Sequence, residues 1–111
     1  GFKELKPSTK QRFSALSFNY PETKQEIEIL INETGIDAEN AKKLVAIGSK
    51  IRNLTELGLT ETVSTRLLVN AATLIKSGLP KRLSTHIAMV EPLTDDLQTV
   101  QSLKDLCDLM I

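Results

Sequence analysis

Arg66 is the residue of this sequence whose position suggests chemistry most directly. It follows Ser64, a good N-cap, because a serine hydroxyl can accept a hydrogen bond from one of the free amides that open a helix. The positive end of the helix dipole disfavours a cation there, by roughly a few tenths of a kcal/mol. Open amides and a guanidinium together bind phosphate well, so an anion in front of the helix would explain Arg66. The alternative is a solvated arginine beside a helix start, and spacing alone favours that alternative.

Other residue types that support catalysis or metal binding are few. His86 is the only histidine, and with no cysteine or carboxylate close in sequence it is interpreted as a surface or helix-face residue. Glu91, Asp95 and Asp96 form a small acidic group, but a proline and a helix start separate them, so no metal site is predicted. Cys107 lies on the apolar side of the last predicted helix and is interpreted as a core residue.

Basic residues occur in two further places. Lys6, Lys10 and Arg12 surround a short predicted helical turn, whereas Lys81 and Arg82 open a later helix and fit an ordinary solvated surface. Arg12 differs from the others because it lies between that turn and a predicted strand. This position would place it at the edge of a domain.

Composition favours a small helical domain in a reducing compartment. The chain has 111 residues, 41% of them apolar and 4% aromatic, enough for a modest core of aliphatic side chains. Fourteen basic and fourteen acidic residues cancel, so nothing indicates a nucleic acid or an anionic membrane as partner. No apolar run approaches the roughly 18 residues of a membrane span. The single cysteine excludes an internal disulfide, and the expected location is the cytoplasm.

One strand precedes the helices. Leu16, Phe18 and Tyr20 alternate with polar residues, which is the period of a half-buried strand, and Pro21 ends it. A lone strand cannot satisfy its ladder hydrogen bonds, so its partners are expected outside this sequence. Residues 1–21 are therefore predicted to be the end of a larger α/β domain, and the chain, which begins with Gly1, is expected to be a piece of a longer protein.

The remaining residues, 22–111, predict a mainly α unit of four to five helices. The first helix spans 22–34 and ends at Gly35. Asp37 caps the second, in which Gly48 indicates close packing against a neighbour. The third spans 64–77 and stops at Gly78, and the fourth runs from 80 until just before Pro92. The residues predicted to face the core are Ile27, Leu30 and Ile31; Leu44, Ile47 and Ile51; Leu68, Ala71, Ala72 and Ile75; Leu83, Ile87 and Val90; and, in a fifth helix capped by Asp95, Val100, Leu103, Leu106 and Leu109.

Four stretches occur in an order that points to a known family. They are LKPSTKQRF at 5–13, FNYP at 18–21, STRLLV at 64–69 and EPLTDD at 91–96. Together they resemble the C-terminal portion of the CbbQ/NirQ/NorQ branch of the MoxR-type AAA+ ATPases. The resemblance implies an N-terminal αβα core that holds nucleotide and a helical lid that closes over it. Residues 1–21 would then be the end of the core, and 22–111 the lid, or CbbQ-type C-terminal domain.

The same resemblance implies roles for two arginines. Arg66 matches the sensor-2 arginine, which reaches the phosphates of nucleotide bound in the same subunit. Arg12 matches the arginine finger, which reaches the γ-phosphate in a neighbouring subunit, and Lys10 in the same turn is an alternative to it. ATP and Mg²⁺ are implied as cofactors of the full-length protein. The sequence has no phosphate-binding loop, so we expect neither bound nucleotide nor ATP hydrolysis from this chain alone.

The implied partners follow from the family as well. Members are ring-forming homo-oligomers, here expected to be hexamers, and work with a von Willebrand factor A-type protein. They remodel or activate a metalloenzyme or a Rubisco-like complex. Two alternatives stay open from the residues themselves: a self-contained helical protein-interaction module with no nucleotide role, and a small enzyme that uses His86 and the acidic group. The lone strand favours the AAA+ interpretation, because a self-contained module has no reason to keep an unpaired strand.

Overall fold

The computed structural model describes residues 20–54 and 62–111. Arg12 and the predicted strand, apart from Tyr20, lie outside these residues, so the division at residue 21 stays a prediction. The described residues are mainly helical and contain no strand, which confirms a small helical fold. The elements, in chain order, are α2 (Thr23–Thr34), α3 (Ala38–Arg52), α4 (Thr65–Lys76), α5 (Lys81–Thr85), a π-helical turn η2 (His86–Val90), a 3₁₀ turn η3 (Glu91–Leu93) and α6 (Leu97–Met110).

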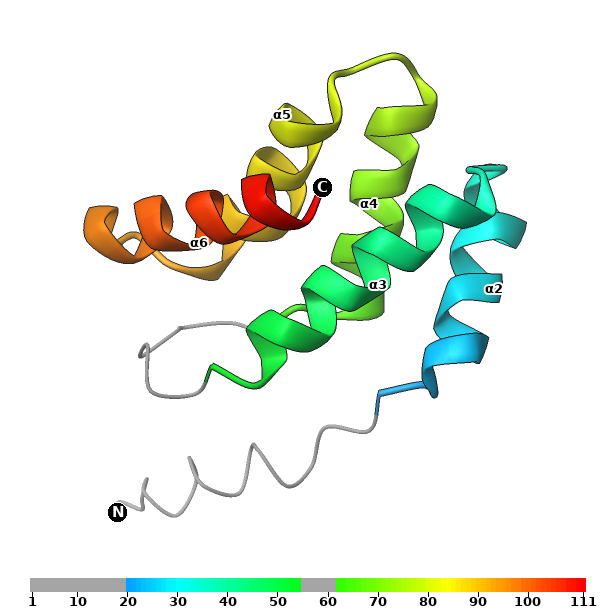
Figure 1. Cartoon of the computed structure of the whole chain (residues 1–111), viewed down its shortest axis with the longest axis horizontal. Coiled ribbons are helices and arrows are strands. Elements are labelled where there is room, and N and C mark those ends of the chain that lie inside the picture. Colours follow the sequence, from blue (N-terminus) through cyan, green and yellow to red (C-terminus); the bar gives the residue numbers. More distant parts are fainter. Residues whose placement is uncertain (1–19, 55–61) are drawn as a thin grey trace, which may run out of the picture.

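Helix α3 occupies the middle of this arrangement (Figure 1). Helix α2 packs against both α3 and α4, and α3 also contacts α4 and α6. Helix α5 and the η2 turn join α4 to α6. In Figure 1, α2 therefore lies on one side of α3, and α5 and α6 lie on the other.

Local capping sets most of the helix boundaries. Gly35 adopts a φ of +77°, which favours glycine, and its N–H donates to the Ile31 carbonyl at 2.8 Å, so α2 ends as predicted. The Asp37 carboxylate accepts from the Asn40 N–H at 3.1 Å and opens α3. This backbone hydrogen bond, followed by one from the Asn40 side chain, holds the pKa of Asp37 below its usual value. Ser64 caps α4 as predicted, because its hydroxyl accepts from the Leu67 N–H.

The core lies where α2, α3 and α4 meet, and it extends toward α6. Leu30, Leu44, Ile47, Ile51 and Leu68 are fully buried there, in agreement with the predicted stripes. A Cβ placed on Gly48 would lie 3.1 Å from the Leu68 Cδ2, so the glycine lets α3 and α4 approach closely. The expectation of close packing at Gly48 is confirmed.

The prediction for the fourth helix is wrong in two respects. The segment does not stay α-helical: after α5 it widens into the η2 turn, in which the Glu91 N–H donates to the His86 carbonyl, and Pro92 lies inside η3. The buried face also differs, because Leu83 and Ile87 are 45% and 41% exposed, while Val90 is buried as expected.

Two hydroxyl residues, Ser84 and Thr85, occupy the buried face of α5 instead. Their burial is tolerated because both hydroxyls donate to backbone carbonyls of their own helix, to Pro80 at 2.9 Å and to Arg82 at 2.8 Å. An apolar stripe in the sequence therefore gave the wrong helix face at this point.

Helix α6 begins one residue later than predicted. Asp96, rather than Asp95, is the N-cap: its carboxylate accepts from the Thr99 hydroxyl at 2.7 Å and from the Thr99 N–H at 2.9 Å. These two hydrogen bonds lower the pKa of Asp96. The Thr99 hydroxyl is the extra donor that favours Asp96 over its neighbour.

Leu109 was predicted to face the core, and it does not. Leu103 and Cys107, four residues apart, define the buried side of α6. Leu109 lies two residues beyond Cys107, which is about 200° around the helix axis, and it is 86% exposed. Leu103 is confirmed as a core residue, and Val100 and Leu106 pack against the core while partly exposed.

Two leucines of α6 provide a matched test of this packing. Leu103→Ala should lower the free energy of unfolding by about 2–5 kcal/mol, because it leaves a cavity in the core. Leu109→Ala should change it by less than about 0.5 kcal/mol, because the side chain is exposed. Chemical denaturation of the 111-residue chain, followed by circular dichroism, measures both. Equal losses in the two variants would contradict the orientation of α6.

Candidate functional site

Arg66 lies in the first turn of α4, and its side chain is exposed. On the opposite side of the helix Leu68, Ala71 and Ala72 are buried, which fixes the direction in which Arg66 faces. Within residues 20–54 and 62–111, no hydrogen bond or ion pair is formed by its guanidinium. Ser64 accepts from the Leu67 N–H, whereas the N–H groups of Thr65 and Arg66 before it have no partner inside the helix. The start of α4 thus combines an outward-facing arginine with backbone donors.

A buried ion pair lies beside this helix start. Glu26 of α2 is 1% exposed, and it faces Arg52 at the end of α3. The guanidinium binds both carboxylate oxygens: Nη1 donates to Oε1 at 2.9 Å, and Nη2 donates to Oε2 at 2.8 Å. The remaining nitrogen of the guanidinium also has a partner, because Nε donates to the Val63 carbonyl at 2.7 Å. Val63 immediately precedes the Ser64 cap. The pair therefore joins α2, α3 and the residue that leads into α4.

Two more residues complete the Glu26–Arg52 cluster, the name used here for Tyr20, Glu26, Arg52, Val63 and Thr65. The Thr65 hydroxyl donates to the Glu26 Oε2 at 2.8 Å, and Thr65 is the first residue of α4. The Tyr20 ring lies 3.8 Å from the centre of the guanidinium, as in a cation–π contact. The Tyr20 hydroxyl is hydrogen-bonded to the Thr62 hydroxyl.

Sequence reasoning missed this cluster. Its members come from positions as far apart as 20 and 65, and no local spacing connects them. One signal was present: Glu26 precedes Leu30 by four residues, so it lies on the apolar stripe of the first helix. A carboxylate on a buried stripe requires a cationic partner, and that requirement predicts the existence of Arg52 or an equivalent residue without identifying it.

His86 has an acidic partner that was not expected. Its Nε2 lies 2.8 Å from the Asp108 Oδ1, so the pair joins η2 to α6 across 22 residues of sequence. The lack of a carboxylate close in sequence therefore did not show that His86 has no acidic partner. The structure favours a structural role, because the contact ties together two elements that already pack on each other.

Cys107 is a core residue, as predicted. It is fully buried on α6, and burial raises the pKa of its thiol from 9.0 to about 11. A hydrogen bond with Thr85 opposes this rise without cancelling it. Because the thiolate is the reactive form of cysteine, this residue is a poor nucleophile at neutral pH.

The acidic residues do not gather into a metal site. Glu91 is paired with the Lys104 Nζ at 3.4 Å, and Asp96 caps α6. No group of three or more His, Cys, Asp or Glu side chains that could hold a metal ion occurs in the described part of the chain. Among the same residues, no helix is both long enough and apolar enough to cross a membrane.

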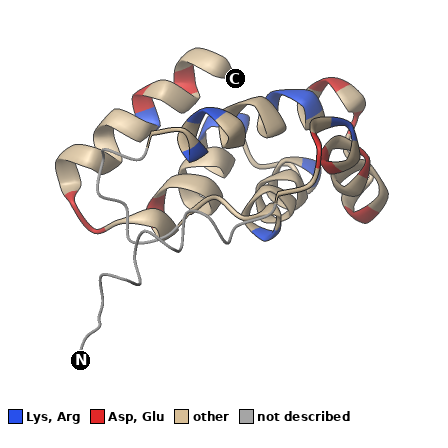
Figure 2. Cartoon of the chain, turned by 90° about the horizontal axis from the view of Figure 1, so that it is seen from below, with Lys and Arg blue, Asp and Glu red and all other residues tan. Residues whose placement is uncertain are grey.

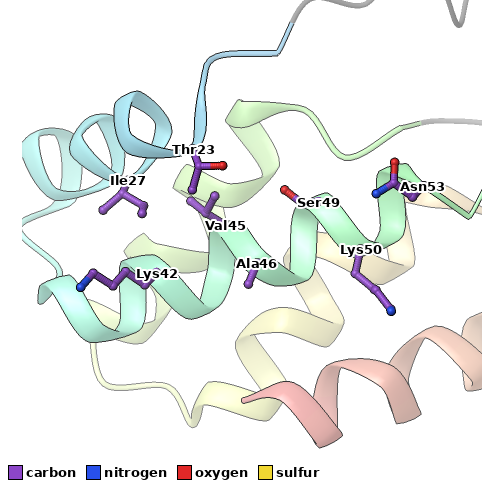
Figure 3. A pocket seen from close by; sticks show the side chains of 8 residues that line it. All are labelled: Thr23, Ile27, Lys42, Val45, Ala46, Ser49, Lys50 and Asn53. Carbon is purple, nitrogen blue, oxygen red and sulfur yellow. The ribbon is translucent and has the colours of Figure 1, made fainter.

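A groove between α2 and α3 is separate from the start of α4. It is open, with a volume of about 570 Å³, and Figure 3 shows Ile27, Val45 and Ala46 along it, with Lys42 toward one end and Lys50 toward the other. Thr23, Ser49 and Asn53 complete its lining. Among the described residues, its lining includes no carboxylate, histidine or cysteine.

Charges are mixed over the surface. In Figure 2 the basic and acidic segments of the described residues are interspersed along the helices. No strongly basic face is visible in this view of the kind that a phosphate backbone attracts.

The family can be decided by comparison with known proteins. Residues 26–110 match the family model described as "CbbQ/NirQ/NorQ C-terminal". The chain belongs to this family. The match begins at Glu26 and includes Arg52, Thr65 and Arg66, whereas Arg12 precedes it.

Curated relatives agree with this assignment. The chain is 47% identical over 109 residues to the denitrification regulatory protein NirQ of Pseudomonas aeruginosa, which covers 98% of the chain and 42% of NirQ. It is 46% identical over 104 residues to protein NorQ of Paracoccus denitrificans, covering 94% of the chain and 38% of NorQ. It is 48% identical over 94 residues to protein CbbQ of Hydrogenophilus thermoluteolus, covering 85% of the chain and 35% of CbbQ. The chain spans about two fifths of the length of these relatives.

The Cys107 thiol allows the packing of α6 in this family member to be tested chemically. At pH 9 the thiolate fraction is about one half for a pKa of 9.0 and about one hundredth for a pKa of about 11. Alkylation by iodoacetamide should therefore be at least about tenfold slower in the folded chain than in denaturant, as measured by mass spectrometry. The raised pKa also implies that the free energy of unfolding falls as the pH rises above 9.0. Equal alkylation rates in the two states would contradict the burial of this residue.

Proposed function

We propose that this chain is the helical lid region of a MoxR-type AAA+ ATPase, and that Arg66 is its sensor-2 residue. In this role Arg66 contacts the phosphates of ATP held by the core domain of the same subunit. The observation that carries the proposal is the exposed guanidinium in the first turn of α4, which has no partner among the described residues. The membership of residues 26–110 in the CbbQ/NirQ/NorQ family supports it.

The physical basis is the combination of donors at the start of α4. An isolated arginine is disfavoured at this end of the helix dipole, whereas an anion is favoured. A phosphate in front of the helix would interact with the guanidinium and with the open amides together. A fixed positive charge of this kind stabilises the charge that develops during phosphoryl transfer.

The remaining parts of the active site would lie elsewhere in the longer protein. We propose that ATP and Mg²⁺ are bound by the αβα core, and that Arg12 is an arginine finger that completes the site of a neighbouring subunit in a hexameric ring. Arg12 lies outside the described residues, so the support for its role is the motif that contains it. Its position before the family match is consistent with a place in the core.

The names of the relatives guide the proposal for the target. NirQ carries the description of a denitrification regulatory protein. We propose that the full-length protein, in the cytoplasm and with a von Willebrand factor A-type partner, remodels or activates a metalloenzyme or a Rubisco-like complex. A helical interaction module with no nucleotide role is the alternative, and the experiment on Arg66 separates the two.

Replacing Arg66 in the full-length protein tests the sensor role. Arg66→Ala should lower ATP turnover by roughly a hundredfold, because it removes a charge that stabilises the transferring phosphoryl group. Arg82→Ala is the matched control, since Arg82 is also an exposed arginine near a helix start and is expected to leave turnover unchanged. Steady-state phosphate release measures the turnover.

The fold should survive both substitutions, because both side chains are exposed. Thermal melting by circular dichroism checks this point. Wild-type turnover in a folded Arg66→Ala protein would refute the sensor role and favour the interaction module.

The finger role of Arg12 is tested by mixing subunits. Arg12→Ala alone should abolish most turnover, because no subunit of the ring then supplies a finger to its neighbour. Mixing it with a variant that keeps Arg12 but cannot bind nucleotide should restore part of the turnover, since mixed rings contain sites with both parts. Phosphate release measured over a series of mixing ratios gives the result. No restoration at any ratio would argue against a finger that acts between subunits.

A further inference from the structure

We infer that the Glu26–Arg52 cluster positions Arg66, with Arg52 and Thr65 as the positioning residues. The inference rests on the proposed function of Arg66 as a phosphate-binding residue. The cluster does not touch the nucleotide in this view. It determines where the first turn of α4 lies and therefore where the Arg66 guanidinium can reach.

The contacts of the ion pair surround the start of α4. The Arg52 Nε donates to the Val63 carbonyl at 2.7 Å, and the Thr65 hydroxyl donates to the Glu26 carboxylate at 2.8 Å. These two residues flank the Ser64 cap, and Arg66 follows directly. The backbone on both sides of the cap is thus fixed by one ion pair, within three residues of the Arg66 position.

The Glu26–Arg52 pair fixes geometry more effectively than it adds stability. Burying two charges requires their desolvation, and apolar residues of similar volume in place of such a pair are often neutral or stabilising. A contribution to stability is therefore a weak explanation for the presence of an ion pair at this place. A two-pronged arginine–carboxylate contact does fix an angle and a distance, which an apolar contact leaves adjustable. Here the contact uses Nε, Nη1 and Nη2 of Arg52, so the orientation of the guanidinium is fully determined.

Tyr20 extends the cluster to the segment that precedes α2. Tyr20 stacks on the Arg52 guanidinium at 3.8 Å, and its hydroxyl bonds to Thr62, which precedes the α4 cap. Tyr20 also lies three residues before Thr23, the first residue of α2. The cluster consequently links the segment that leads into α2 to the start of α4.

The experiment uses the full-length protein and two matched pairs of variants. Thr65→Val keeps the volume of the side chain and removes its hydrogen bond to Glu26, whereas Thr65→Ser keeps the hydroxyl. Arg52→Lys keeps the charge and loses the two-pronged contact. Thr65→Val and Arg52→Lys should each lower kcat for ATP hydrolysis by roughly tenfold with little change in KM, because a displaced charge stabilises the transition state less. Thr65→Ser should keep wild-type kcat.

The decisive measurement is a double-mutant cycle with Arg66→Ala. If Thr65 and Arg52 act through Arg66, then Thr65→Val/Arg66→Ala and Arg52→Lys/Arg66→Ala should be no slower than Arg66→Ala, to within roughly twofold. If the kcat of a double variant instead falls by the product of the two single-variant losses, the residues act independently and the positioning role is overturned. A wild-type kcat in Thr65→Val and Arg52→Lys would overturn it as well, while leaving the sensor role of Arg66 intact.

The failure of the proposed function gives a different pattern. Arg66→Ala would then retain wild-type turnover, and the inference would fall with it. Thermal melting of each variant, with turnover measured well below the transition, separates lost positioning from lost folding. Thr65→Val leaves the Glu26–Arg52 pair intact, so it keeps the test valid even if Arg52→Lys does not fold.

Discussion

The buried pair between Glu26 and Arg52 is the contact on which the arrangement of α2, α3 and α4 depends. Glu26 is almost completely shielded from water, so a missing partner would leave a carboxylate unpaired in the interior, and breaking a buried pair typically lowers stability by about 3–5 kcal/mol. Arg52 can meet this requirement only when α2 and the end of α3 lie at one separation and one angle. Its third donor then selects the path of the chain into α4 through the carbonyl of Val63. The need to pair the buried Glu26 carboxylate thereby defines the relative positions of α2, α3 and the start of α4 more narrowly than apolar packing alone would.

Apolar packing brings α3 and α4 close enough for these polar contacts to form. The lack of a side chain at Gly48 lets Leu68 of α4 approach α3, which turns the buried face of α4 inward and Arg66 outward. The region of α5 and α6 also packs through buried apolar residues, among them Met89, Val90 and Leu103, and the contact between His86 and Asp108 joins η2 to α6. The buried residues of the two regions belong to one core. Because such a core is closely packed, a displacement of helices in one region strains the packing of the other.

Sequence reasoning succeeded where the controlling interaction is local. The glycine at 35, the aspartate at 37 and the serine at 64 each end or begin a helix through hydrogen bonds within a few residues, and such bonds are visible in the order of the residues. It failed at α5 and η2, where packing selected Ser84 and Thr85 over the more apolar Leu83 and Ile87. It failed for the Glu26–Arg52 pair because the partners are 26 residues apart and no pattern in one sequence connects them. The role proposed for Arg66 was suggested by its position in the first turn of α4.

Two departures from the most stable arrangement occur next to each other at the start of α4. Arg66 places a positive charge where the helix dipole disfavours it, and Glu26 and Arg52 form a charged pair in the interior, where apolar residues of similar volume are often at least as stabilising. Departures from local rules that gather at one place indicate a site under selection for something besides folding. The charge of Arg66 becomes favourable when an anion is present in front of the helix. The Glu26–Arg52 pair contacts the backbone just before Arg66. Their adjacency is the physical reason for the proposal that the Glu26–Arg52 cluster and Arg66 act together.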